Sequence, residues 1–336
     1  QTVSGAVGYG DVRNGQIKGI FKPTLYNTIT GEITEYPANY TNTHTLIKWN
    51  CYGQDSILLR LENGKSEITG FAETTDFSEE YMPGEAELIL HEPNVCVLDM
   101  ARFKIDDGEW QPKEEMLKIT DSVKKQLNMS VAAASGAQPW AFKAEPPKNT
   151  VTVEMTVESE IQLSNIELGL EDINISTVWW NGEKIALNSN GYYVDFSIAK
   201  VNLGKLKKGI NTLTVTLPFN VVSNIENYFL LGDFGVDVKG SKVKIIEKPK
   251  NIYFGNWVNQ GIPFYGGALT YRTKINGGAK TKVAFDLLSA PAVTVELDGK
   301  RVSNVSLAPH TADLGELSKG EHTLDFTVYA SRINTF

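Results

Sequence analysis

Four pairs of adjacent acidic residues are the first candidates for chemistry in this chain. They are Glu79–Glu80, Asp106–Asp107, Glu114–Glu115 and Glu171–Asp172. Hydrolysis of a glycosidic bond needs two carboxyl groups about 5–9 Å apart that flank the bond. Adjacent residues of a strand point to opposite faces, so Asp106–Asp107 and Glu171–Asp172 converge only if a turn re-aims them. We therefore interpret the pairs as solvated surface acids and assign no catalytic residue.

Other catalytic and metal-binding patterns are incomplete. The segment "GDFG" (232–235) contains the Asp-Phe-Gly of protein kinases, but no Gly-rich loop, strand lysine or His-Arg-Asp element accompanies it. Asp233 is therefore predicted to end a strand and cap the following backbone. The histidines show no metal-ligand spacing; they are His44, His91, His310 and His322. No cofactor is expected to be required.

Aromatic residues beside amide side chains are typical of carbohydrate-binding sites, because rings stack on sugar C–H groups and amides bind hydroxyls. The candidates for such contacts are Trp179, Trp180, Asn256, Trp257, Gln260 and Tyr265, and the other aromatic platforms are Trp110 and Trp140. Trp179 and Trp180 point to opposite faces of a strand, so one of them is expected in the core. For the segment 255–272 we favour packing between two domains over direct sugar contact.

The elements that carry these residues are predicted to be mostly β-strands. Apolar and polar residues alternate strictly in "TVTVEMTVE" (150–158), and "TLTVTL" (212–217), "AVTVEL" (292–297) and "TLDFTV" (323–328) share this period of two. One amphipathic helix is predicted over 113–128, with Pro112 before it and the acids Glu114 and Glu115 in its first turn. A linker is predicted over 130–148, since this stretch is rich in small residues, Gly and Pro.

The N-terminal part predicts a small β-sandwich-like domain over residues 1–72. The segment 21–36 resembles a hairpin with a turn centred on Thr30 and Gly31, and "DSILLRLE" (55–62) predicts a buried strand that closes the domain.

An internal repeat indicates two related sandwiches beyond this domain. "VNLGKLKKGINTLTVTL" (201–217) aligns without a gap to "ADLGELSKGEHTLDFTV" (312–328). Upstream, "WWNGEKI" and "ELDGKRV" both predict a hairpin with an Asn-Gly or Asp-Gly turn. We expect a first sandwich over 73–245 and a second over 246–336; strands from 88–112 could instead complete the second, which would make 140–245 an insertion.

These segments resemble the galactose-binding-like jelly roll, a sugar-binding β-sandwich of glycoside hydrolases. The Asn-Gly hairpin and the Gly-x-Asn-x-Leu strand of Gly209, Asn211 and Leu213 carry this resemblance, and the second copy departs from it at His322. More specifically, the chain resembles the C-terminal half of bacterial α-L-rhamnosidase-type enzymes over roughly residues 17–336. The blocks are 97–119, 137–140, 228–236, 260–272 and 331–336.

The resemblance implies a multidomain glycoside hydrolase whose catalytic carboxylates lie in a separate N-terminal barrel. We therefore expect this chain to be a non-catalytic accessory region that supports the barrel and binds carbohydrate. The alternatives are a purely structural or adhesive β-domain array and, less favoured, a glycosidase in its own right. A structural calcium ion is compatible with such sandwiches, but the sequence assigns no ligands to it.

Charge and composition limit the classes of molecule that the chain is expected to bind and the environments in which it is expected to lie. The net charge is −8, and no basic stripe of the kind that neutralises nucleic-acid phosphates is present. No apolar run approaches the roughly 20 residues of a membrane span. Cys51 and Cys96 are expected to be two separate buried thiols. The sequence leaves the compartment open, with a secreted or cell-surface location favoured over a cytoplasmic one.

Overall fold

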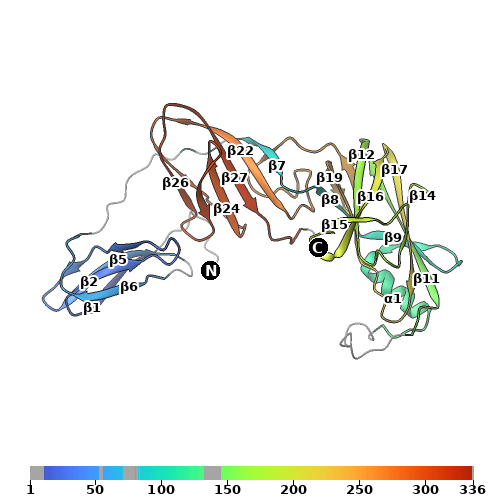
Figure 1. Ribbon diagram of the computed structural model, residues 1–336, viewed down its shortest axis with the longest axis horizontal. Helices are drawn as coiled ribbons and strands as arrows, with labels where there is room; N and C mark the ends of the chain where they lie inside the picture. Colours follow the sequence, from blue (N-terminus) through green and yellow to red (C-terminus); the bar gives the residue numbers. More distant parts are fainter. Residues whose placement is uncertain are drawn as a thin grey trace. The chain divides into compact units, whose positions relative to one another are not determined.

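The chain is mostly β and forms two compact units in a computed structural model (Figure 1). The structure describes residues 11–52, 56–70, 80, 82, 84–131 and 145–334. Glu79, Trp140 and most of the expected linker therefore lie outside the described residues. One unit is Gln1–Gly84 with Arg272–Tyr329, and the other is Glu85–Tyr271 with Ala330–Phe336.

The unit of Glu85–Tyr271 contains two facing sheets. One sheet has the strand order β10 (Gln111–Glu115), β9 (Met100–Ile105), β11 (Asn149–Ser159), β17 (Gly209–Phe219), β13 (Thr177–Trp180) and β14 (Glu183–Lys184). The other has the order β15 (Ser189–Tyr193), β16 (Asp195–Leu206), β12 (Leu163–Leu170), β18 (Tyr228–Gly232) and β8 (Asn94–Leu98). A hairpin of β19 (Gly235–Lys239) and β20 (Lys242–Ile246) pairs with β11, and β21 (Asn251–Tyr253) pairs with β7 (Glu85–Leu90).

Strict alternation builds the core of this sandwich. Val151, Val153 and Val157 of β11 are at most 2% exposed, as the period of two predicted. They share one hydrophobic cluster with residues of the opposite sheet such as Leu168 and Val201. Since each fully buried Val or Leu side chain contributes roughly 1.5–3 kcal/mol, the paired apolar faces hold the two sheets together.

The predicted helix is confirmed, but it begins later than expected. α1 (Met116–Gln126) packs on the sandwich through Met116, Ile119 and Val123, which are fully buried. Residues 111–115 form β10 instead, because pairing with β9 satisfies their backbone groups. The carboxylate of Glu115 is the N-cap of α1 and accepts a hydrogen bond from Leu117 N at 3.1 Å. Glu114 and Glu115 therefore precede the first turn rather than lie in it, and Pro112 precedes the helix as expected. α1 is too short and too polar to cross a bilayer, and the described residues contain no other helix.

The N-terminal part of the other unit has two three-stranded sheets. Their orders are β1 (Asp11–Lys18), β5 (His44–Cys51), β4 (Asn39–Tyr40), and β3 (Ile33–Glu35), β2 (Phe21–Tyr26), β6 (Leu59–Asn63). The predicted hairpin forms between β2 and β3, where the Asn27 side chain accepts hydrogen bonds from the Ile29 and Thr30 amides. The expectation of a buried strand at 55–62 is wrong: β6 is an edge strand, and Leu61 is 38% exposed.

The internal repeat folds twice in the same way. In the C-terminal part of this unit, β27 (Gly320–Tyr329) lies between β22 (Ala268–Gly277) and β24 (Ala292–Leu297), and β24 pairs with β25 (Lys300–Val305). β26 (Thr311–Glu316) pairs with β23 (Lys280–Ala284). The step from β26 to β27 thus passes from one sheet to another, as does the step from β16 to β17. The repeated glycines need positive φ in both copies, with values of 78° at Gly204 and 73° at Gly315.

Each copy fixes its turn with a different pair of side chains. In the first copy, the Asn181 Oδ1 atom accepts a hydrogen bond from Thr212 N, and its Nδ2 donates to Asn211 Oδ1 at 3.0 Å. In the second copy, Asp298 Oδ1 accepts from Thr323 N, and Asp298 Oδ2 pairs with His322 Nδ1 at 2.7 Å. The departure at His322 noted in the sequence is therefore matched by a second change, from Asn to Asp, at its partner.

This difference makes the second copy sensitive to pH. The hydrogen bond with Asp298 raises the pKa of His322, and the same bond lowers the pKa of Asp298. The stabilisation by His322 is fully present below about pH 6.5, the pKa of an unperturbed histidine, and is lost as the pH rises through its higher folded-state pKa. The contribution of Asp298 is lost only when the pH falls through its lowered pKa.

We expect the urea midpoint of the wild-type chain to fall between about pH 5.5 and 8.5 by more than that of His322→Asn, because only the wild-type chain loses the His322 contribution in this range. The variant carries the side chain of the equivalent position 211, which does not titrate. A wild-type midpoint whose pH dependence equals that of the variant would contradict this assignment. Groups common to both proteins cancel in the comparison.

Candidate functional site

The amides of the predicted sugar-binding loop are engaged within the loop. Gln260 Oε1 accepts a hydrogen bond from Tyr253 N at 2.7 Å, and Gln260 Nε2 donates to the carbonyls of Tyr253 and Asn256. Asn256 Oδ1 accepts from Val258 N at 3.0 Å. Both side chains therefore form hydrogen bonds with backbone groups that have no strand or helix partner in this irregular segment, which is the usual role of amides in turns.

The two aromatic residues of the same loop also point to internal partners. Trp257 Nε1 donates to the carbonyl of Tyr265 at 3.1 Å. Tyr265 is fully buried, and its hydroxyl accepts from His91 N and donates to the carbonyl of Ala268. Burial raises the pKa of this hydroxyl above its usual range. Tyr265 thus presents no ring face to solvent, while Trp257 stays half-buried.

Glycine at position 267 leaves space beside this tyrosine for an ion pair. A Cβ atom at Gly267 would collide with the Glu92 carboxyl group, so a larger residue would displace that side chain. Glu92 binds both terminal nitrogens of Arg332, with 2.8 Å between Arg332 Nη2 and Glu92 Oε2. The space left by the missing side chain of Gly267 is therefore occupied by a carboxylate of the same unit.

The adjacent tryptophans divide between the core and the surface as the strand period predicts. Trp180 is 3% exposed and donates from Nε1 to the carbonyl of Lys205 at 2.8 Å. Trp179 is half-buried on the outer face of β13, opposite Lys184 and Thr214. Of this pair, only Trp179 has a ring that a ligand can reach. Trp110 is covered by a cation, since the Arg102 guanidinium lies 4.4 Å from its ring centroid.

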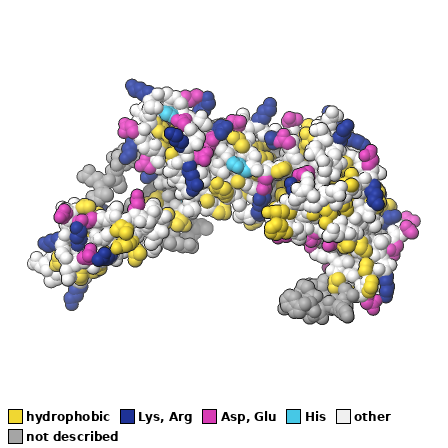
Figure 2. All heavy atoms as spheres, viewed as in Figure 1, with side chains coloured by type: hydrophobic (Ala, Val, Ile, Leu, Met, Phe, Trp, Pro, Cys, Tyr) yellow, Lys and Arg dark blue, Asp and Glu magenta, His cyan; other side chains and the backbone are white. Residues whose placement is uncertain are grey.

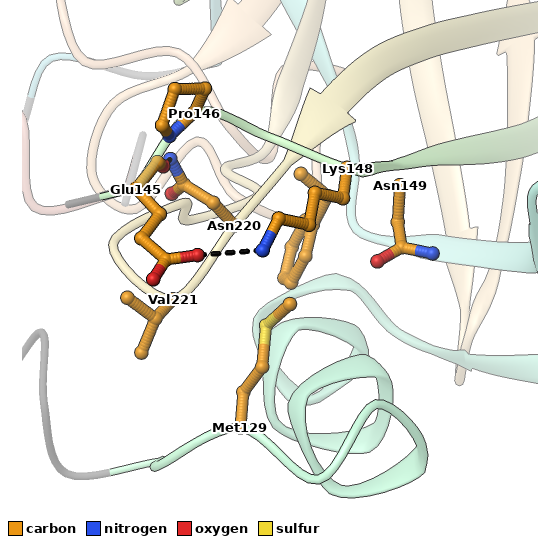
Figure 3. A pocket seen from close by; sticks show the side chains of 8 residues that line it. Met129, Glu145, Pro146, Lys148, Asn149, Asn220 and Val221 are labelled. Carbon is orange, nitrogen blue, oxygen red and sulfur yellow. Dashed lines mark hydrogen bonds and ion pairs between the residues drawn. The ribbon is translucent and has the colours of Figure 1, made fainter.

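A groove of about 450 Å³ lies beside β17, within the size range of small-molecule sites (Figure 3). Its lining residues are Met129, Glu145, Pro146, Lys148, Asn149, Phe219, Asn220 and Val221. Figure 3 shows the Glu145 and Lys148 side chains turned toward each other, and their ion pair measures 2.7 Å. Glu145 is the only carboxylate among these described lining residues, so they do not by themselves supply the two acids of a glycosidase.

Several of the acidic pairs have structural roles rather than free carboxylates. Asp106 accepts hydrogen bonds from Asn149 Nδ2 and Thr150 N at 2.7 Å each, which lowers its pKa. Glu114 accepts from Ser122 Oγ at 2.8 Å. The expectation of solvated surface acids is thus incomplete, because Asp106 and Glu114 accept hydrogen bonds from neighbouring segments and Glu115 caps α1. Asp233 follows β18 as expected, but its carboxylate pairs with Lys248.

One group of acids does converge, at the end of β12. Glu171, Asp172 and Glu226 line a hollow of about 10 Å³. Burial, and then the charges of Glu226 and Asp172, raise the pKa of Glu171. A carboxyl group with a raised pKa suits a general acid, but this volume holds about one water molecule and no sugar ring. In the described residues, no three His, Cys, Asp or Glu side chains are grouped to hold a metal ion.

An exposed aromatic pair was missed by the sequence reasoning. Tyr192 is 50% exposed and Phe196 is 84% exposed, and their ring centroids lie 4.5 Å apart. Between them, Tyr193 is buried. The alternation in "GYYVDFS" places Tyr192 and Tyr193 on opposite faces, but it does not indicate which of the two faces is exposed.

Comparisons with known proteins gave structural similarity without a family match. No protein-family model matches the sequence, and the search of curated proteins gave no match. A rhamnosidase from Novosphingobium sp. PP1Y is 15% identical at a TM-score of 0.23, over 64% of this chain and 22% of that chain. A β-D-mannosidase from Dictyoglomus thermophilum is 14% identical at a TM-score of 0.27, over 70% of this chain and 31% of that chain.

A third similar structure is the α-L-rhamnosidase of Streptomyces avermitilis complexed with L-rhamnose. It is 13% identical at a TM-score of 0.31, over 96% of this chain and 34% of that chain. This chain therefore spans about a fifth to a third of the length of the three glycosidases. Similarity of this extent assigns no activity to this chain.

Proposed function

We propose that this chain is a non-catalytic accessory region of a glycoside hydrolase, which supports a catalytic barrel outside this sequence and contacts carbohydrate. The observation that carries the proposal is the duplicated turn module. Both copies keep the hairpin, and the first copy keeps the Gly-x-Asn-x-Leu strand at Gly209 on which the resemblance to sugar-binding sandwiches rests, while the second copy, which starts at Gly320, departs from it at His322. Their polar residues serve the turn itself, as Asn211 and His322 do.

The arrangement of the described acids supports a role without catalysis. The sugar-sized groove offers a single carboxylate, and the converging acids at Glu171 line a hollow too small for a sugar ring. The displayed face has Lys and Arg side chains interspersed with Asp and Glu (Figure 2). Such a mixed surface suits an uncharged partner such as a glycan better than nucleic acid. No cofactor is included in the proposal, and a structural calcium ion stays a prediction.

A purely structural or adhesive β-domain array is the second candidate. It is favoured by the engagement of Gln260, Trp180 and Tyr265 in internal hydrogen bonds. The two candidates differ in one respect: only the first predicts an exposed surface that binds sugar.

Affinity gel electrophoresis of the whole chain in plant and bacterial polysaccharides tests the proposal. We expect at least one polysaccharide to retard the chain, and no turnover of aryl-glycosides by the same protein. Equal mobility in all gels would contradict sugar binding and support the purely structural array. Turnover of an aryl-glycoside would show that the chain is a hydrolase in its own right.

A further inference from the structure

Two exposed aromatic rings form a platform at the turn between β15 and β16. Phe196 and Tyr192, the aromatic platform, are tilted by 47° at a centroid separation of 4.5 Å. Figure 2 shows hydrophobic side chains at the surface of this unit, over β15. Phe196 is 84% exposed, so its ring leaves unrealised the free energy that burial against a ligand would supply.

Several contacts constrain the backbone of the turn that carries this platform. Val194 has φ of 61°, which β-branched residues rarely adopt. The Asp195 carboxylate accepts hydrogen bonds from Ser197 N at 2.8 Å and Ser197 Oγ at 2.7 Å. Tyr193 anchors the turn from inside, with its ring 5.4 Å from that of Phe229. Strained backbone of this kind persists where neighbouring contacts hold it, so the backbone that carries the rings needs little ordering when a ligand arrives.

The polar groups around the platform determine which ligand it fits. Glu167 accepts from Asn190 Nδ2 at 2.5 Å and pairs with Lys200 at 3.3 Å, so the charge of this lysine is compensated within a local network. Asp195 is exposed in the turn itself, and its pKa is lowered by the Ser197 hydrogen bonds. An ionised carboxylate accepts hydrogen bonds from sugar hydroxyls, whereas it repels a uronate or a sulfate.

We propose that Tyr192 and Phe196 stack against a ring of a neutral oligosaccharide or polysaccharide, with Asp195 as an acceptor for its hydroxyl groups. The inference rests on the proposed accessory function and deepens it by naming the surface and the class of ligand. The C–H face of a neutral pyranose would cover both rings and so bury apolar surface that is exposed in the folded chain.

Affinity gels with neutral polysaccharides and with polygalacturonate test this inference on the whole chain. The double variant Tyr192→Ala/Phe196→Ala is expected to bind the retarding neutral polysaccharide at least about tenfold more weakly, since two ring contacts are lost. Phe196→Trp keeps an aromatic face and is expected to retain binding. The matched control is Ile210→Ala, which removes a side chain that is 64% exposed on β17 of the same unit. Urea midpoints of all variants show that the fold is kept.

The outcomes separate this inference from the proposed function. Unchanged retardation of the double variant overturns the platform and leaves the accessory function standing. Equal mobility of the wild-type chain in every neutral gel overturns both. Retardation by polygalacturonate alone contradicts a neutral ligand. A change of oligomeric state in the double variant, with sugar binding unchanged, would show instead that a second copy of the chain covers the rings.

Discussion

Replacing Trp180 by alanine is expected to lower the free energy of unfolding by about 3–5 kcal/mol, the usual cost of deleting a large aromatic side chain from a core. Trp180 is buried among the residues of the sandwich core, and its indole nitrogen satisfies the carbonyl of Lys205. Alanine at position 180 would leave a cavity in the core and would also leave the carbonyl of Lys205 without its hydrogen bond from the indole. Chemical denaturation followed by circular dichroism measures the change.

The neighbouring tryptophan provides the matched control. Trp179→Ala removes a half-buried ring that lies opposite Lys184 and Thr214 across the strands, so the loss is expected to stay within about 1 kcal/mol. Equal losses for the two variants would contradict the assignment of one ring to the core. A stable Trp179→Ala chain that loses retardation in polysaccharide gels would instead identify Trp179 as a sugar contact.

Replacing Asn211 by alanine is expected to cost about 2–4 kcal/mol, because a buried amide that serves several backbone groups is lost. The residue is fully buried. Its Oδ1 accepts from Lys207 N, and its Nδ2 donates to the carbonyls of Lys207 and Gly209. Urea denaturation measures the loss, and it should appear as a lower midpoint with an unchanged slope.

Asn202 serves as the comparison on β16, the strand that precedes β17 in sequence. It is exposed, and its side chain accepts a hydrogen bond from Gly204 N at 2.6 Å. Asn202→Ala is therefore expected to cost about 0.5–1.5 kcal/mol. A loss as large as that of Asn211→Ala would show that the turn depends on the exposed bond rather than on the buried amide.

The repeat shows how far the sequence alone could lead. The spacing of Leu and Gly in 201–217 and 312–328 predicted two equivalent strand–turn–strand units, because glycine at positive φ and alternating apolar residues are local requirements. The departure at His322 was visible as well. Its partner Asp298 is 24 residues away in sequence, so the pairing of the two changes became apparent only in three dimensions.

The errors arose where tertiary contacts outweighed local preference. Residues 111–115 have helix-starting composition, yet pairing with β9 draws them into a strand. Leu61 has the character of a core residue, yet β6 lies at a sheet edge where its side chain stays exposed. For the candidate site, amide chemistry was ambiguous: Gln260 hydrogen-bonds a loop backbone with the same atoms that would bind a sugar. Exposure of Phe196 could not be derived from a period of two, which does not say which face is outside.

The ion pair between Glu92 and Arg332 has a consequence for the order in which the chain matures. The two residues are 240 positions apart. At translation speeds of about 5–20 residues per second, Arg332 is therefore synthesised roughly 10–50 s after Glu92. Strands β8 to β18 all emerge within that interval. The strands that build the hydrophobic core can thus fold before Arg332 is available to pair with Glu92.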